Sequence, residues 1–157
     1  MIAIDTILWI YNVDANSREH KNVRSWLEGR RGKGVIETED LLINTVIAME
    51  IVHNLRRAAK LSAEDVYDYV LRILTLKNLV LDSLDLDALN QSINTFEDYF
   101  QYGIGGRDAT VLASMRRYGV TTIATHDKNL LTVREIERID PTHYPPLILH
   151  KGEKFGH

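Results

Sequence analysis

Short apolar runs alternate with longer amphipathic stretches along the chain. Three to five consecutive apolar or β-branched residues predict a buried strand, and apolar residues spaced three and four apart predict a helix that packs on a sheet. Runs of the first kind lie at residues 2–4, 41–44, 78–81 and 121–125. Helical spacing fills the intervals, at residues 6–11, 23–29, 45–59, 62–73, 86–100 and 107–118. This order predicts an α/β domain with a central parallel sheet.

Two segments interrupt this alternation. Residues 30–34, which begin with Arg30 and Arg31, predict a loop that carries a small basic patch. Residues 141–157 contain Pro145 and Pro146, which favours a tail that lies over the domain or mediates contacts rather than a further core element. We therefore expect one domain over residues 1–140, followed by a C-terminal tail over residues 141–157.

Composition narrows the chemistry that such a domain can perform. The 157 residues are 45% hydrophobic and 26% charged, and none is Cys. This excludes disulfides, thiolate zinc sites, iron–sulfur clusters and thiol nucleophiles, and it fits a reducing cytoplasm. A chain of this length buries enough surface to fold without a structural metal, so we expect any bound metal to be functional. Catalysis must then use carboxylates, hydroxyls or His.

Charge and hydropathy restrict the partners. The formal net charge is -3, from 19 basic and 22 acidic residues with 6 His counted as neutral. This balance argues against a bulk electrostatic clamp on nucleic acid, although a local basic patch can still form. The first residues lack a basic segment followed by a long apolar one, and no later stretch reaches about 18 apolar residues. We expect a cytoplasmic protein without a membrane-spanning segment.

Two acidic residues follow predicted strands. Asp5 ends the strand at 2–4, and Asp127 comes two residues after the strand at 121–125. In an open parallel sheet, ligands collect at the carboxyl ends of the strands, where the strand order reverses beside the first strand. The alternative for Asp5 is an N-cap of the helix that begins at Thr6, and the alternative for Asp127 is a turn or cap residue.

Two more acidic residues lie on predicted helices. Glu50 is surrounded by apolar residues, so burying it without a partner would be costly. Its alternatives are a side chain that reaches solvent at the domain edge or an ion pair with Arg57. Asp108 opens a helix and shares a face with Val111 and Met115. Its alternative is a first-turn carboxylate that complements the helix dipole.

Together the four carboxylates can converge on one pocket. Two carboxylates about 5 Å apart repel by roughly 3 kcal/mol at an effective dielectric constant of about 20. Four of them therefore need a neutralising cation. Hard oxygen ligands in this number suit magnesium or manganese better than zinc. We expect Asp5, Glu50, Asp108 and Asp127 to ligate Mg2+ or Mn2+.

The motifs that carry these acids resemble those of a known family. The Gly-Gly-Arg-Asp-Ala stretch at 105–109 and the stretch at 120–130 resemble the carboxy-terminal signature of PIN-domain ribonucleases. Residues 1–6 and 48–51 resemble the two amino-terminal acidic motifs of that family. The order and spacing of the acids match over about the first 140 residues. The small size is similar to that of VapC-type toxins of toxin–antitoxin pairs.

The resemblance implies a three-layer α/β/α fold in which the four acids hold magnesium or manganese at the carboxyl edge of the sheet. It also implies hydrolysis of RNA phosphodiester bonds by a metal-activated water, which requires no His or Lys as general base. Thr125 corresponds to the hydroxyl residue that supports the site. Asn129 stands where many members carry another acid, and we expect it to support the site as well.

Basic residues follow Glu50 on the same predicted helix. Arg56, Arg57 and Lys60 come six to ten positions later, about 9 to 15 Å along a helix. We expect the two arginines to contact phosphates of the RNA substrate. Their alternative is charge that complements the C-terminal end of the helix dipole, which is favoured for Lys60. His126 can also contact substrate, although a lone His at a strand end is more often a surface residue.

The expected partners are RNA, a cognate antitoxin and a second copy of the chain. An acidic pocket open to RNA also admits a guanidinium group, so we expect an antitoxin with an apolar helix that docks beside the sheet edge and an Arg that reaches Asp5 and Asp108. Apolar surface around Trp9 and Tyr69 is expected to serve a homodimer. The alternative function is a catalytically weak PIN-like module that binds RNA or acts as a scaffold. A phosphatase-like site is disfavoured, because Ile7 stands where a second Asp would be needed.

Overall fold

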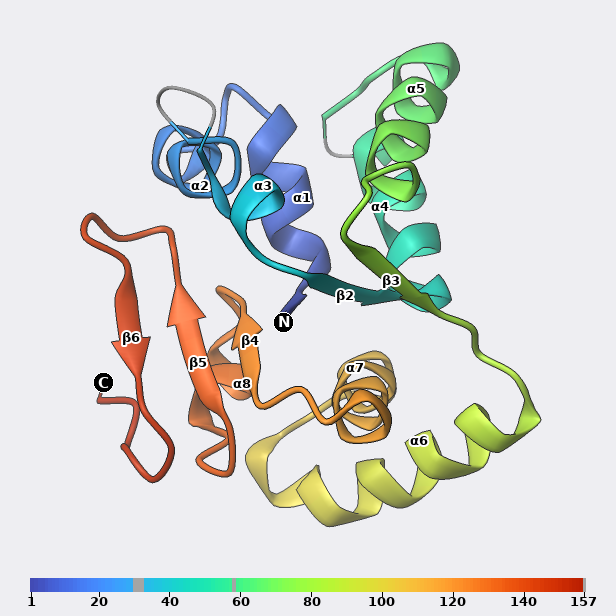
Figure 1. The fold of residues 1–157 in the computed structure, drawn as a ribbon, viewed down its shortest axis with the longest axis vertical. Coiled ribbons are helices and arrows are strands. Elements are labelled where there is room, and N and C mark those ends of the chain that lie inside the picture. The colour runs from blue at the N-terminus through green and yellow to red at the C-terminus, as the bar shows by residue number, and fades with distance from the viewer. Residues whose placement is uncertain (30–32, 58, 157) are drawn as a thin grey trace.

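The computed structural model describes residues 1–29, 33–57 and 59–156, and a six-stranded sheet runs through their centre (Figure 1). The strand order is β3-β2-β1-β4-β5-β6. Neighbouring strands are parallel, except that β6 runs antiparallel to β5. The strands span Ile2–Ile4 (β1), Leu41–Asn44 (β2), Leu79–Asp82 (β3), Thr122–Ala124 (β4), Glu137–Asp140 (β5) and Leu147–Leu149 (β6). The expected α/β fold with a mostly parallel central sheet is confirmed.

Helices cover both faces of this sheet. In Figure 1, α1 to α5 lie above the sheet and α6 and α7 lie below it. The helices span Thr6–Val13 (α1), His20–Leu27 (α2), Val35–Thr38 (α3), Thr45–Arg57 (α4), Ala63–Leu74 (α5), Leu86–Tyr99 (α6), Gly106–Tyr118 (α7) and Lys128–Thr132 (α8), with a 3-10 turn, η1, at Phe100–Tyr102. Because α4 and α7 both contact β2 from opposite sides, the sheet is the middle of three layers.

The strand order reverses at β1, and this reversal positions the pocket described below. From β1, the strands β2 and β3 extend the sheet in one direction, and β4 and β5 extend it in the other. Helices on both faces allow the inner strands to be mostly apolar, and Ile4 and Ile43 are at most 1% exposed. Ile4 pairs with Ala124 in the neighbouring strand. The segments that leave β1 and β4 therefore start side by side, as the sequence predicts for a ligand site.

The structure contains four short elements that the sequence analysis did not predict, which are α3, α8, β5 and β6. Residues 147–149 form β6 at the edge of the sheet, and Leu149 is 8% exposed. This differs from the tail expected over residues 141–157. A strand of three residues is too short to show an alternating pattern. Arg30 and Arg31 of the expected basic loop lie outside the described residues.

A buried arginine fastens this C-terminal segment to the sheet. Arg138 in β5 is 0% exposed. Its guanidinium donates hydrogen bonds to the backbone carbonyls of Leu131, Ile136, His150 and Glu153. Carbonyl oxygens thus satisfy the buried cation without a carboxylate. The turn after β6 is held by this side chain in addition to the strand pairing.

Of the two aromatic residues expected on a dimer surface, Trp9 is buried and Tyr69 is partly buried. Trp9 is 2% exposed, and the Tyr69 hydroxyl donates to the Trp9 carbonyl oxygen at 3.0 Å. Exposed apolar side chains are found on the outer face of α5, where Tyr67, Leu71 and Leu74 are 66%, 44% and 39% exposed. Across the described ranges, no helix has both the length and the apolar character needed to cross a membrane.

Candidate active site

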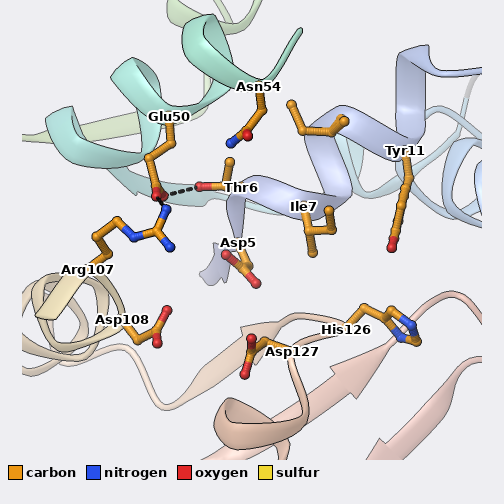
Figure 2. A pocket seen from close by; sticks show the side chains of 11 residues that line it. Asp5, Thr6, Ile7, Tyr11, Glu50, Asn54, Arg107, Asp108, His126 and Asp127 are labelled. Atoms are coloured by element: carbon orange, nitrogen blue, oxygen red, sulfur yellow. Dashed lines mark hydrogen bonds and ion pairs between the residues drawn. The ribbon is translucent and has the colours of Figure 1, made fainter. Parts of the chain in front are cut away.

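An open pocket of about 440 Å³ lies at the carboxyl ends of β1 and β4 (Figure 2). Side chains from α1, α4, α7 and the segment after β4 line it: Asp5, Thr6, Ile7, Ile10, Tyr11, Glu50, Asn54, Arg107, Asp108, His126 and Asp127. The four acids selected from the sequence are all among these residues. The structure therefore brings them to one pocket although they are up to 122 positions apart in the sequence, from Asp5 to Asp127.

Asp5 and Asp127 approach the pocket from adjacent strands. Thr125 connects them, because its hydroxyl donates to Asp5 Oδ2 at 2.6 Å and accepts from the Asp127 N–H at 2.9 Å. The Asp5 side chain makes no cap hydrogen bond to α1, which disfavours its interpretation as a simple N-cap. Asp127 does cap α8, since its Oδ1 accepts from the N–H groups of Asn129 and Leu130. That cap uses only one of its two carboxylate oxygens.

Asp108 brings a third carboxylate from the first turn of α7. Its Oδ2 accepts from the Gly105 N–H at 3.0 Å, and its place in the first turn also agrees with the alternative of a carboxylate that complements the helix dipole. Burial raises the pKa of Asp108, and the charges of Asp127 and Glu50 raise it further. The Gly105 hydrogen bond and the neighbouring Arg107 act in the opposite direction. The rise shows that Asp108 is partly withdrawn from water and faces other negative charge.

Glu50 is held by neighbours at the edge of the pocket. Only 18% of its side chain is exposed, its Oε2 accepts from the Thr6 hydroxyl at 2.8 Å, and its Oε1 pairs with Arg107. The partner is therefore Arg107 and not Arg57, which the sequence offered as an alternative. The physical reason is that α7 packs against α4 beside Glu50, whereas Arg57 lies two turns further along α4.

Asp5 can hold a proton near neutral pH, chiefly because it is buried. Burial raises the pKa of Asp5 to about 7, with added repulsion from Asp108 and Asp127 and an opposing hydrogen bond from Thr125. Within the described ranges, no three acidic or His side chains meet closely enough to form a finished metal site. The pocket thus contains carboxylates that repel one another, and Asp108 and Asp127 both add to the rise in the pKa of Asp5.

Four residues selected from the sequence lie outside the pocket lining: Thr125, which still bonds to Asp5 and Asp127, and Arg56, Arg57 and Asn129. Arg56 and Arg57 are exposed near the end of α4, and Arg56 donates to the Leu61 carbonyl oxygen at 2.9 Å. The helix carries them roughly 9 Å or more beyond Glu50. Asn129 also lies outside the lining, and its amide donates to the Gly103 carbonyl oxygen at 2.9 Å. Asn129 therefore contacts the loop that precedes α7.

Arg107 and Tyr11 are among the pocket residues that were not selected from the sequence. Arg107 stands in the first turn of α7, where the helix dipole disfavours a cation, and this mismatch was a signal that could have identified it. Tyr11 lies on the same face of α1 as Ile7, four positions earlier. That relationship became informative only once Asp5 was placed at the start of this helix. His126 was considered from the sequence, and it does line the pocket.

Comparisons with known proteins agree with this geometry. No curated protein matches the chain in sequence. Solved structures with the same fold include VapC20 of Mycobacterium tuberculosis, a toxin that cleaves the sarcin-ricin loop, with a TM-score of 0.61, 14% identity and coverage of 78% of this chain and 87% of that chain. FitAcB of Neisseria gonorrhoeae gives a TM-score of 0.64 and 16% identity, covering 91% of this chain and 99% of that chain. VapBC2 of Rickettsia felis, bound to promoter DNA, gives 0.53 and 16%, covering 81% and 89%.

These structural likenesses establish the fold. In sequence, residues 2–136 match the PIN domain family, and this range contains all four pocket acids. The chain therefore belongs to the PIN domain family.

Proposed function

We propose that this protein is a metal-dependent endoribonuclease that hydrolyses RNA phosphodiester bonds in the cytoplasm and serves as the toxin of a toxin–antitoxin pair. One observation carries the proposal: Asp5, Asp108 and Asp127 come from three separate elements and line one pocket. Within the described part of the chain, no Lys or Arg forms an ion pair with any of them. Family membership and the fold shared with toxins support the same conclusion.

Magnesium or manganese is the cofactor that suits this donor set. Carboxylates that repel one another require positive charge, and ligands made only of oxygen favour a hard divalent cation. The Oδ1 of Asp108 and the Oδ2 of Asp127 are not used by the hydrogen bonds that cap their helices, and Asp5 lies beside both (Figure 2). These three residues would hold the ion. When bound, it would supply a water of lowered pKa and neutralise charge on the phosphate.

The protein's own side chains position the remaining parts of the site. Thr125 fixes the orientation of the Asp5 carboxylate through its hydroxyl group. Arg107 is 75% exposed, so its guanidinium can turn to an RNA phosphate at the pocket rim. A phosphate that engages Arg107 releases one oxygen of Glu50, which then completes the set of four acids.

Protein partners are part of the proposal. The structures named FitAB and VapBC2, each bound to DNA, share this fold. An apolar groove between α4 and α5, beside the edge strand β3, includes Val52, Val66 and Val70 and has a volume of about 360 Å³. An antitoxin helix would dock there and send an Arg to the acidic pocket. The homodimer would use exposed apolar side chains such as Ile93 on α6 and Phe100 in η1, which are 52% and 66% exposed.

Cleavage of RNA by the purified full chain tests the nuclease directly. A labelled single-stranded RNA pool is incubated with magnesium, manganese or chelator, and products are separated on a gel. We expect cleavage only with metal, its loss in Asp108→Asn, and its retention in Asp68→Asn, a matched change at an exposed acid on α5. RNA that is bound but left intact under all metal conditions would favour the catalytically weak binding or scaffold module.

A further inference from the structure

The pocket has a second end that the proposed hydrolysis does not use. Figure 2 shows the acidic side chains on one side of the pocket and Tyr11 and His126 on the other. Ile7 and Ile10 also line the pocket. We refer to Ile7, Ile10, Tyr11 and His126 as the aromatic end. It joins the acidic end without a dividing wall, because all these residues line one continuous cavity.

Helix α1 supplies three of the four residues at the aromatic end. Ile7, Ile10 and Tyr11 share a helix face because they are three and four positions apart. Ile10 is 4% exposed, and Tyr11 is partly buried. Tyr11 comes six residues after Asp5, roughly 9 Å along the helix axis. A ligand anchored at the acidic end can therefore place a ring against this surface.

His126 is held in one orientation by residues outside the pocket. Its Nδ1 lies 2.9 Å from Asp140 Oδ2 and 3.1 Å from Thr142 Oγ1. Asp140 is itself fixed, since it is 1% exposed and its Oδ1 accepts from the N–H and the hydroxyl of Thr142. A carboxylate only accepts hydrogen bonds, so Nδ1 carries the proton and Nε2 of the neutral ring is an acceptor. No other described residue bonds Nε2, which leaves it for a ligand.

The two rings at the aromatic end form a corner and not a stack. The centroids of Tyr11 and His126 are 6.1 Å apart, with an angle of 61° between the ring planes. Burial raises the pKa of Tyr11, and the charges of Glu19, Asp140 and Asp5 raise it further. The Tyr11 hydroxyl therefore remains a hydrogen-bond donor under cellular conditions. Flat apolar surface, one donor and one acceptor are thus gathered in one place.

We propose that the aromatic end binds the base of an RNA nucleotide next to the phosphate held at the acidic end. The proposal deepens the nuclease function and rests on it. Bases in single-stranded RNA are recognised by stacking on aromatic rings and by hydrogen bonds to their edges, which are the features gathered here. A base that carries an amino group beside a ring nitrogen can donate to His126 Nε2 and accept from the Tyr11 hydroxyl. Tyr11 and His126 are therefore specificity residues.

Binding without cleavage tests the subsite independently of catalysis. Fluorescent single-stranded RNA decamers of A, C or U are titrated with the full chain in chelator, alongside an abasic decamer with the same backbone. We expect the best base-containing decamer to bind about tenfold more tightly than the abasic one, the effect of stacking one base. Tyr11→Ala should remove this preference, because the abasic strand already lacks the base that Tyr11 contacts.

Two further variants separate the interactions at the aromatic end. His126→Asn keeps a side-chain amide near the position of Nδ1 for Asp140 but removes Nε2, so it should change which base is preferred. Tyr11→Phe keeps the ring and removes only the hydroxyl, so it should also change which base is preferred. Tyr67→Ala, at a tyrosine 66% exposed on α5, is the matched control and should leave the binding ratio unchanged. Circular dichroism and melting curves of each variant confirm folding.

Each outcome is decisive for one of the two proposals. An equal affinity for abasic and base-containing RNA, or a preference that survives Tyr11→Ala, overturns the subsite. If the preference is lost in Tyr11→Ala while the wild-type protein cuts no RNA with either metal, the subsite stands and the nuclease function fails. If RNA is cut and the preference survives in the Tyr11 and His126 variants, the nuclease stands and the subsite fails.

Discussion

Among the five parallel strands, β3 and β5 are the outer ones, and β1 and β4 are inner strands that border the pocket. The aspartates at the ends of the outer strands have different partners from those that follow the inner strands. At the end of β3, Asp82 is 5% exposed, pairs with Arg117 and accepts from the Ser114 hydroxyl at 2.5 Å. At the end of β5, Asp140 is 1% exposed and binds His126 and Thr142. Asp82 thus has a cation as partner, and Asp140 accepts hydrogen bonds from His126 and Thr142.

The inner strands β1 and β4 are followed by Asp5 and Asp127, which form no ion pair with a Lys or Arg among the described residues. Asp5 receives the Thr125 hydroxyl, and Asp127 receives two backbone N–H groups. Neutral donors stabilise a carboxylate less than a cation does, so negative charge accumulates between these two strands. A protein that can pair a buried acid with Arg117 gains stability from doing the same elsewhere. The acids at the inner strands that lack a cationic partner are therefore the candidates for function that the predictions below test.

The largest difference between the two regions should appear in catalysis. Asp108→Asn keeps the size of the side chain and its hydrogen bond to Gly105, but it removes a charge from the acidic end. We expect RNA cleavage to fall by roughly 10²- to 10³-fold, as for loss of one electrostatic contact to the transition state. Single-turnover rates with magnesium measure the effect. Cleavage at the wild-type rate would remove Asp108 from the site.

A substitution in the outer region should lower the free energy of unfolding. Asp82→Asn leaves Arg117 without its carboxylate in a position where only 18% of that side chain is exposed. Breaking a buried pair on one side should lower the free energy of unfolding by about 3 kcal/mol. Asp98→Asn is the matched control, because Asp98 and Arg116 are 56% and 47% exposed and such pairs contribute about 0 to 1 kcal/mol. Urea denaturation compares the two, and equal losses would contradict the distinction.

The contribution of the inner region to stability should depend on pH. Burial raises the pKa of Asp5 from 3.8 to about 7, so the folded protein holds a proton there that the unfolded chain releases. This contribution to stability is complete below pH 3.8 and is lost as the pH rises through about 7. Without metal, Asp5→Asn should match the wild type at low pH and melt higher at pH 8, by roughly 3 °C or more.

Magnesium provides the matching test of the same acids. A cation that binds only the folded state raises the melting temperature, and it competes with the proton on Asp5. The rise should therefore be larger at pH 8 than at pH 6, and Asp127→Asn should reduce it. Differential scanning fluorimetry with metal and with chelator gives both values. Curves that coincide at every pH would show that the pocket binds no metal.

The sequence predicted the fold better than it predicted which residues pair with each charged side chain. Apolar runs identified β1 to β4 and the long helices, because burial on both faces of a sheet leaves a continuous apolar signal. The short elements β5 and β6 escaped, since β5 contains Arg138, whose burial depends on carbonyls from three later or neighbouring turns. Contacts of that kind exist only in the folded chain and leave no local pattern.

The sequence identified the acids that line the pocket, but it did not identify the residues that pair with them. Asp5 and Asp127 stood out because they follow strong strand signals. Asp82 also ends a strand, yet only the structure shows that Arg117, 35 positions later, neutralises it. The pairing of Glu50 with Arg107 spans 57 positions and was likewise beyond local reasoning. Sequence position thus identified candidate charges, and three-dimensional packing decided which remain unpaired.

The smallest expected effect concerns basic residues inside and outside the pocket lining. Arg107 lines the pocket, whereas Arg56 and Arg57 lie outside its lining near the end of α4. If phosphate binding occurs at the pocket rim, Arg107→Ala should raise the KM for RNA about tenfold, the value of one charge-assisted contact of roughly 1.4 kcal/mol. The double variant Arg56→Ala/Arg57→Ala should change KM by less than about twofold, because exposed charges at this distance are screened by salt. Steady-state kinetics at two salt concentrations separates the cases. A larger effect from the double variant would move the RNA path from the pocket rim to the C-terminal end of α4.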